Sequence, residues 1–131
     1  MKGKITVKGI DISYKRINSD DYISLSNIAR ARENEYPSDV IRNWLRTYRT
    51  IGYLGVWERL YNPDFNSVEY ERVKEEAPEN GFVMTPKRWV DTTNAIGIIP
   101  SMGKYADIYA HKDIAFKFAS SFLLISVQNM V

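Results

Sequence analysis

Apolar and polar residues alternate near the N-terminus of the chain. Between residues 4 and 17 the apolar side chains fall at every second position, in the order Ile5, Val7, then Ile10, Ile12, Tyr14. A period of two places successive side chains on opposite faces of a strand. The pattern therefore predicts two short strands, with Gly9 near the turn or bulge between them.

The spacing of apolar residues then becomes helical. Ile23, Leu25, Ile28 and Ala29 predict a first helix over residues 25–33, with Ser24 or Ser26 as its N-cap. The run Pro37-Ser38-Asp39 predicts that a second helix starts at Ser38 and continues to residue 50. Two helices joined by a short turn are typical of a helix-turn-helix.

A third helix is expected over about 53–61, ended by Asn62-Pro63, because Gly52 and Gly55 interrupt the preceding pattern. The aromatic residues of this region lie at helical spacing beside aliphatic ones, which favours a core role over base stacking. They are Trp44, Tyr48, Tyr53, Trp57, Tyr61 and Phe65.

The second half of the chain predicts a connector, a helix, a hairpin and a last helix. Residues 62–81 form an acidic stretch with enough apolar residues for one short helix. Thr85-Pro86 predicts a helix start, since a capping hydroxyl precedes proline at the first helical position, and Asn94 or Gly97 ends that helix. Strands are expected at 96–99 and 105–110, and a helix follows from about His111. This order predicts an α+β fold in which a β-hairpin wing follows a helix-turn-helix core.

Composition narrows the chemistry. A chain of 131 residues is the usual size of one domain, and the absence of cysteine excludes a disulfide framework, a cysteine zinc site and a thiol nucleophile. Its one histidine, His111, excludes a histidine-rich metal site and is expected to cap a helix. No glycine-rich phosphate loop, signal peptide or membrane span is evident. We therefore expect a cytoplasmic protein that is not an enzyme and needs no cofactor or metal.

The charges are unevenly distributed. The chain has 18 basic and 16 acidic residues, for a net charge of +2. Residues 61–80 hold 6 of the acidic residues and only 2 of the basic ones, so this block carries −4 and the remainder +6. If the block lies on a face of its own, the remaining surface favours an anionic partner.

Basic residues recur at helical spacing in the predicted second helix. Arg42, Arg46 and Arg49 are expected on one face, with Asn43 beside them and the apolar residues opposite. A guanidinium matches both phosphate oxygens and the major-groove edge of guanine, and an asparagine can pair with adenine. Spacing alone leaves a simple solvated face open as the alternative. Further candidate DNA contacts are Arg30, Arg32, Lys104, Tyr105 and Lys112.

Four motifs occur in order along the chain. They are the W-x-R pair Trp44 and Arg46, the run TI-x-x-LG-x-WE from Thr50 to Glu58, NP-x-FN at 62–66, and YAHKDIAF at 109–116. Together they resemble the KilA-N domain of large DNA viruses, phages and bacteria, which is related to the fungal APSES domain. The resemblance covers about Tyr22 to Phe122 and implies that residues 1–131 are one DNA-binding domain without catalytic activity.

The resemblance implies contact with double-stranded DNA through the second helix and a wing at 101–109. It also implies a regulatory protein of a phage, a mobile element or a bacterium. Members usually carry an arginine and then Gly-Gly-Thr in the wing, where this chain has Lys104 and then Ala106-Asp107-Ile108. The ending SFLLISVQNMV replaces the family's charged helix. An alternative is therefore a protein-interaction module that has lost DNA affinity, and the apolar end is a candidate homodimer contact.

Overall fold

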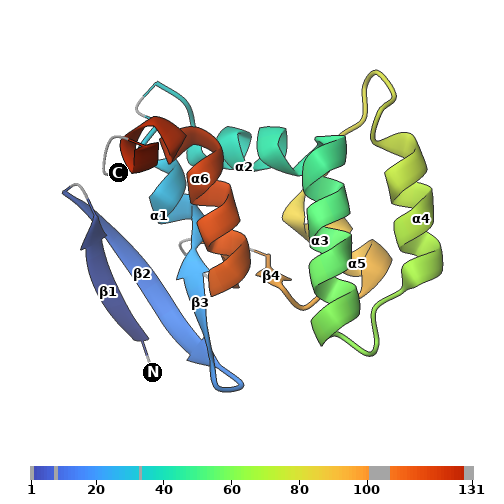
Figure 1. Ribbon diagram of the computed structural model, residues 1–131, viewed down its shortest axis with the longest axis horizontal. Helices are drawn as coiled ribbons and strands as arrows, with labels where there is room; N and C mark the ends of the chain where they lie inside the picture. The colour runs from blue at the N-terminus through green and yellow to red at the C-terminus, as the bar shows by residue number, and fades with distance from the viewer. Residues whose placement is uncertain (1, 8, 33, 101–106, 129–131) are drawn as a thin grey trace.

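The computed structural model describes residues 2–7, 9–32, 34–100 and 107–128, and side chains up to Ser121 except those of Lys2 and Val7. These residues form an α+β fold with a five-stranded antiparallel sheet and six helices (Figure 1). The elements are β1 (Lys2–Val7), β2 (Ile10–Ile17), β3 (Asp20–Ser24), α1 (Leu25–Ala29), α2 (Pro37–Leu45), α3 (Tyr48–Tyr61), α4 (Ser67–Glu76), α5 (Pro86–Thr93), β4 (Ile98–Ile99), β5 (Tyr109–His111) and α6 (Lys112–Gln128).

Strands β1, β2 and β3 form an antiparallel meander. The two predicted strands are present, and Gly9 between them has φ +79°, a conformation that glycine adopts without strain. Strand β3 was not predicted, because Ile23 also fits the helical spacing that follows it. The turn between β2 and β3 consists of Asn18 and Ser19. Both have positive φ, which matches the right-handed twist of a two-residue hairpin.

The chain returns to this sheet only at its far end. Strand β5 pairs with β3, with Tyr22 opposite His111, and β4 pairs with β5, with Ile99 opposite Tyr109. The strand order is therefore β1-β2-β3-β5-β4. The predicted hairpin is confirmed at its base. Residues 101–106, which include Lys104 and Tyr105, lie outside the described residues.

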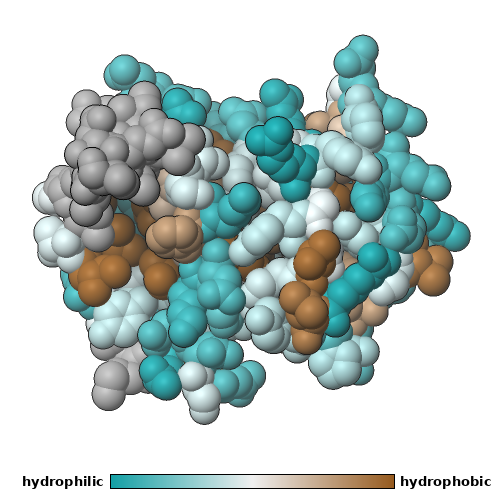
Figure 2. All heavy atoms as spheres, in the orientation of Figure 1, coloured by the Kyte–Doolittle hydropathy of each residue, from teal (hydrophilic) through white to brown (hydrophobic). Residues whose placement is uncertain are grey.

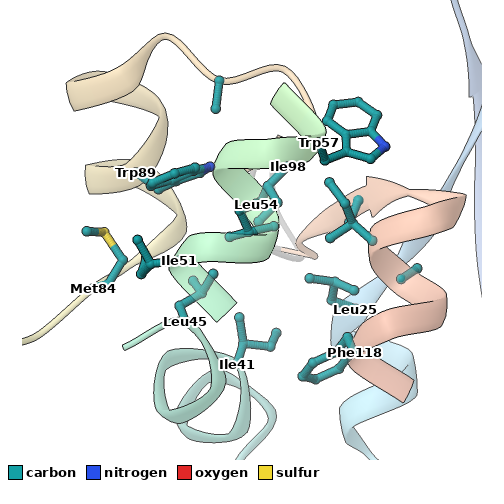
Figure 3. Close-up of a cluster of buried hydrophobic side chains, with 14 of the residues drawn as sticks. Leu25, Ile41, Leu45, Ile51, Leu54, Trp57, Met84, Trp89, Ile98 and Phe118 are labelled. Atoms are coloured by element: carbon teal, nitrogen blue, oxygen red, sulfur yellow. The ribbon is translucent and has the colours of Figure 1, made fainter. Parts of the chain in front are cut away.

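Helices α1 and α6 pack on the sheet and connect it to the core. Of the two predicted caps, Ser24 and not Ser26 caps α1, and its side chain accepts the amide N–H of Asn27. The helix is shorter than predicted, because it ends at Ala29. The largest buried side chains form one continuous cluster that joins the sheet to helices α2, α3 and α5 (Figure 3); they include Leu25, Ile41, Leu45, Ile51, Leu54, Met84, Trp89, Ile98 and Phe118.

Helices α3, α4 and α5 lie at the other end of the molecule (Figure 1). Asn62 ends α3 as predicted, Thr85 caps α5, and Asn94 ends α5 with φ 57°. Gly55 is the contact point between α3 and α4: a Cβ there would lie 2.0 Å from the ring of Tyr70. The interruption expected from Gly52 and Gly55 before residue 53 is wrong, since both lie inside the continuous helix α3, where close packing requires Gly55.

Two further predictions for the helices are wrong. Ser38 is not the cap of α2, because Tyr36 occupies that position without a side-chain hydrogen bond and Pro37 is the first helical residue. Tyr48 and Tyr61 are not core residues: they are 51% and 58% exposed, while Trp57 between them is buried. The aromatic spacing continues along α3 beyond the part of the helix that the core covers.

Candidate nucleic-acid interface

Helix α2 has one buried side and one polar side. Val40, Ile41 and Leu45 are buried, whereas Arg42, Asn43 and Arg46 are exposed. Successive residues of an α-helix are rotated by about 100° around its axis. Viewed along that axis, these polar positions and Asp39 therefore fall within one arc of about 100°. The buried side is held by the core, so the helix presents its polar arc on a rigid support. Hydrophilic side chains line the edge of the molecule near α2 (Figure 2).

Arg49 does not belong to this helix. The predicted helix over 38–50 is wrong, because α2 ends at Leu45 and α3 begins at Tyr48. Thr47 separates the two helices: its backbone is extended, and its Oγ1 caps α3 by accepting the amide N–H of Thr50 at 3.2 Å. Arg46 therefore lies at the C-cap of α2 and Arg49 in the first turn of α3, only three residues apart in sequence but on different helices.

The segment after α1 supplies the other two candidate arginines. Arg30 is the C-cap of α1 and Arg32 follows it, and both are exposed. Arg32 and Asn43 line one polar hollow of about 230 Å³, whose apolar wall includes Trp44 and Phe118. The structure therefore brings Arg32 next to the polar arc of α2. Helices α1 and α2 pack on each other, but the connection 30–36 is longer than the short turn that the sequence predicted.

Carboxylates accompany two of these arginines. Arg42 pairs with Asp39 on the same helix face, and Arg32 Nη1 lies 3.5 Å from Glu35 Oε2. Among the residues that the structure describes, Arg30, Arg46 and Arg49 take part in no salt bridge. These three guanidiniums are thus available to an external anion without breaking an internal ion pair.

Lys112 lies apart from the arginines. It is the first residue of α6, about 9 Å along the helix axis from Phe118, which contacts Trp44 of α2. Figure 1 accordingly places the start of α6 at its end away from α2. Lys112 instead lies at an apolar groove of about 460 Å³ between β1, β2 and α6, whose lining includes Ile5, Ile12 and Phe116. Part of this apolar surface is visible in brown beside β1 and α6 in Figure 2.

Glu58 is a buried carboxylate whose role the sequence did not reveal. Its side chain accepts three hydrogen bonds, from Asn62 Nδ2 (3.0 Å), the N–H of Ile96 (3.0 Å) and the N–H of Gly97 (2.8 Å). Burial raises the pKa of Glu58 above its usual value of 4.5, although the hydrogen bonds act in the opposite direction. The carboxylate ties α3 to the residues that lead into β4, and so it positions the base of the hairpin.

His111 has the capping role that was predicted for it. The side chain is buried, and its Nδ1 accepts the amide N–H of Asp113 at 3.1 Å in the first turn of α6. Its own amide N–H donates to the carbonyl of Gly97 at 2.8 Å. His111 thus links the sheet, the start of α6 and the residue that Glu58 holds.

The acidic block forms its own region around α4, far from α1 and α6 in Figure 1. Basic residues from neighbouring helices partly neutralise it: Arg59 Nη2 lies 2.8 Å from Glu71 Oε1, and Arg88 Nη2 lies 3.0 Å from Glu76 Oε2. The separation of charge between the two ends of the molecule is therefore smaller than the sequence blocks alone suggested.

The described part of the chain offers no group of three or more histidine, aspartate or glutamate side chains that could hold a metal ion. In the same residues, no helix is both long and apolar enough to cross a bilayer. The features that stand out are an α+β scaffold and a helix with a buried side and an arginine-bearing side. This arrangement is typical of the class of small domains that bind a polyanion.

A comparison with protein families identifies the family within this class. The family model of the KilA-N domain matches residues 5–129, nearly the whole chain, so the chain belongs to the KilA-N domain family. KilA-N domains are generally DNA-binding domains and do not form an enzyme family. No curated protein and no solved structure matches the chain.

Proposed function

We propose that this protein binds double-stranded DNA through the polar arc of α2, in the manner of a helix-turn-helix. The observation that carries the proposal is the two-sided character of α2: Arg42, Asn43 and Arg46 are exposed while the opposite side is anchored in the core. A guanidinium binds phosphate or the guanine edge in a bidentate way, and an exposed amide can pair with adenine.

The flanking residues take supporting roles in this proposal. Arg30 and Arg49 bind phosphates on either side of the helix, and Arg32 does so from the hollow that it shares with Asn43. The β4–β5 hairpin acts as a wing, with Lys104 and Tyr105 as its contacts, and Lys112 adds a phosphate contact further along the molecule. Binding of this kind suits a regulatory protein of a phage, a mobile element or a bacterium.

The test is the binding of the full chain to a random-sequence 20-base-pair duplex, measured by fluorescence anisotropy at about 50 and about 200 mM salt. A fourfold rise in salt weakens binding about 3.5-fold for each phosphate contact, because each contact contributes about 0.9 to the log–log slope. Three contacts therefore predict a loss of about 40-fold. Absence of binding at about 50 mM salt would overturn the proposal.

Self-association through residues 123–131 stays a prediction, since their side chains lie outside the described residues. Sedimentation velocity of the full chain measures it directly. A monomer at high protein concentration contradicts it, and it also removes the main support for the alternative role as a protein-interaction module.

A further inference from the structure

The polar arc of α2 carries an acid as well as arginines. Asp39 is the third residue of the helix and pairs with Arg42 one turn later, and the two side chains are 44% and 48% exposed. Glu35, in the connection before α2, pairs with Arg32 three residues earlier, and these side chains are 42% and 51% exposed. Two of the five arginines in this region are thus accompanied by a carboxylate.

These two ion pairs contribute little to the stability of the fold. An exposed ion pair of this kind contributes about 0–1 kcal/mol, because water and salt screen it and both side chains lose freedom. A carboxylate on a face that meets DNA has a larger effect on binding. It opposes every phosphate, whatever the base sequence, and it occupies the guanidinium that would otherwise bind one.

An aspartate in the first turn of a helix is also well placed to contact bases. The N-terminal residues of a recognition helix approach base edges in the major groove. A carboxylate has only acceptor atoms, and the exocyclic N4 amine of cytosine is a donor in that groove. The cost of placing Asp39 near phosphates is therefore offset where a cytosine lies opposite it.

We propose that Asp39 and Glu35 are specificity-determining residues, which weaken binding of Arg42 and Arg32 to DNA of arbitrary sequence, and that Asp39 favours sites with a cytosine opposite the start of α2. This inference rests on the proposed DNA-binding function. The acids make this face discriminate between sequences, and Asp39 accepts a hydrogen bond from the N4 amine of cytosine.

The chain offers a closely matched control. Glu69 is also the third residue of its helix, α4, and it also pairs with an arginine three residues later, Arg72, at 3.3 Å. Helix α4 lies far from α1 (Figure 1). The variants Asp39→Asn, Glu35→Gln and Glu69→Gln each remove one negative charge and one i,i+3 pair, and only the first two do so on the candidate interface.

The experiment uses the full chain, with unfolding by circular dichroism to show that each variant is folded. Affinities are measured by anisotropy at about 50 mM salt, first for a random-sequence duplex and then for a duplex selected for tight binding to the unaltered chain. Asp39→Asn and Glu35→Gln are expected to raise affinity for the random duplex about threefold to tenfold. The salt slope of Asp39→Asn steepens by about 0.9, since the guanidinium of Arg42 is released for phosphate.

Asp39→Asn is further expected to reduce the preference for the selected duplex about fivefold or more, and that duplex is expected to have cytosine at a fixed position. Glu69→Gln changes both affinities less than about twofold. If Asp39→Asn and Glu35→Gln behave like Glu69→Gln while the unaltered chain binds DNA, the inference is overturned and the DNA-binding function stands. If neither the unaltered chain nor any variant binds, both proposals are overturned.

Discussion

The carboxylate of Glu58 should be essential for joining α3 to the hairpin, and Glu58→Gln tests this. Three N–H groups donate to its two oxygens: Oε1 accepts from Asn62 and Ile96, and Oε2 accepts from Gly97. A glutamine replaces one oxygen by an NH₂ group, so in either orientation at least one buried donor loses its acceptor and faces another donor. Leaving such a donor unpaired costs about 1–3 kcal/mol.

The measurement is thermal and urea unfolding followed by circular dichroism. For a chain of this length, a loss of about 1–3 kcal/mol lowers the Tm by roughly 3–15 °C. Glu75→Gln is the matched control, because Glu75 is exposed on α4, and it should change stability by less than about 0.5 kcal/mol. A Glu58→Gln protein as stable as the control would refute the assignment of Glu58 as the acceptor that holds Ile96 and Gly97.

The pH dependence gives an independent check on Glu58. Its pKa is raised in the folded state, so between the unfolded value of about 4.5 and the raised folded value the folded protein binds more protons than the unfolded one. The contribution of Glu58 to the unfolding free energy therefore rises as pH falls through this window. Glutamine does not titrate, so the difference between the unaltered chain and Glu58→Gln should widen as pH falls through the raised pKa of Glu58 toward 4.5. A difference that narrows on acidification would show that the hydrogen bonds, and not burial, determine this pKa.

Three further substitutions test the packing, the helix break and the interface. Gly55→Ala places a Cβ against the ring of Tyr70, and overpacking of this kind should cost about 1–3 kcal/mol in urea unfolding, whereas Gly52→Ala, with open space around it, should not destabilise the chain. Thr47→Ala removes the cap of α3 and should cost about 1 kcal/mol, and a value no larger than that of Ser38→Ala would contradict the capping role. Arg46→Ala should lower the salt slope of DNA binding by about 0.9, and an equal effect of Arg72→Ala on α4 would argue against α2 as the contact.

Local signals in the sequence predicted the ends of several elements correctly. Ser24, Thr85 and Asn94 act through hydrogen bonds or backbone conformations within four residues of themselves, so the residue type limits the choice of cap to one or two candidates. The break at Thr47 was missed because the apolar spacing of α2 continues smoothly into α3. Periodicity reports which side of a helix is buried, and two helices that bury adjoining sides can share one pattern.

The features that could not be predicted from the sequence depend on contacts between residues far apart in the chain. Glu58 occupies an ordinary helical position, and its partners Ile96 and Gly97 lie 38 and 39 residues further along the chain. The arginines were recognisable as candidates from their spacing. Their arrangement was not, because the hollow that joins Arg32 to Asn43 forms only when α6 packs against both segments.

Under the proposed function, the corner between α2 and α3 has a consequence for how a preference for particular DNA sequences can change. Arg46 and Thr47 form the junction between the two helices, and Arg49 lies in the first turn of α3. The two helices are fixed by Leu45 and Ile51, both fully buried. The distance between the two guanidiniums therefore depends on the volumes of side chains that never meet solvent. A methyl group gained or lost at one of these buried positions would change the orientation of one arginine relative to the other. If both arginines bind DNA as proposed, the preferred sequence would then change while each proposed contact residue keeps its identity.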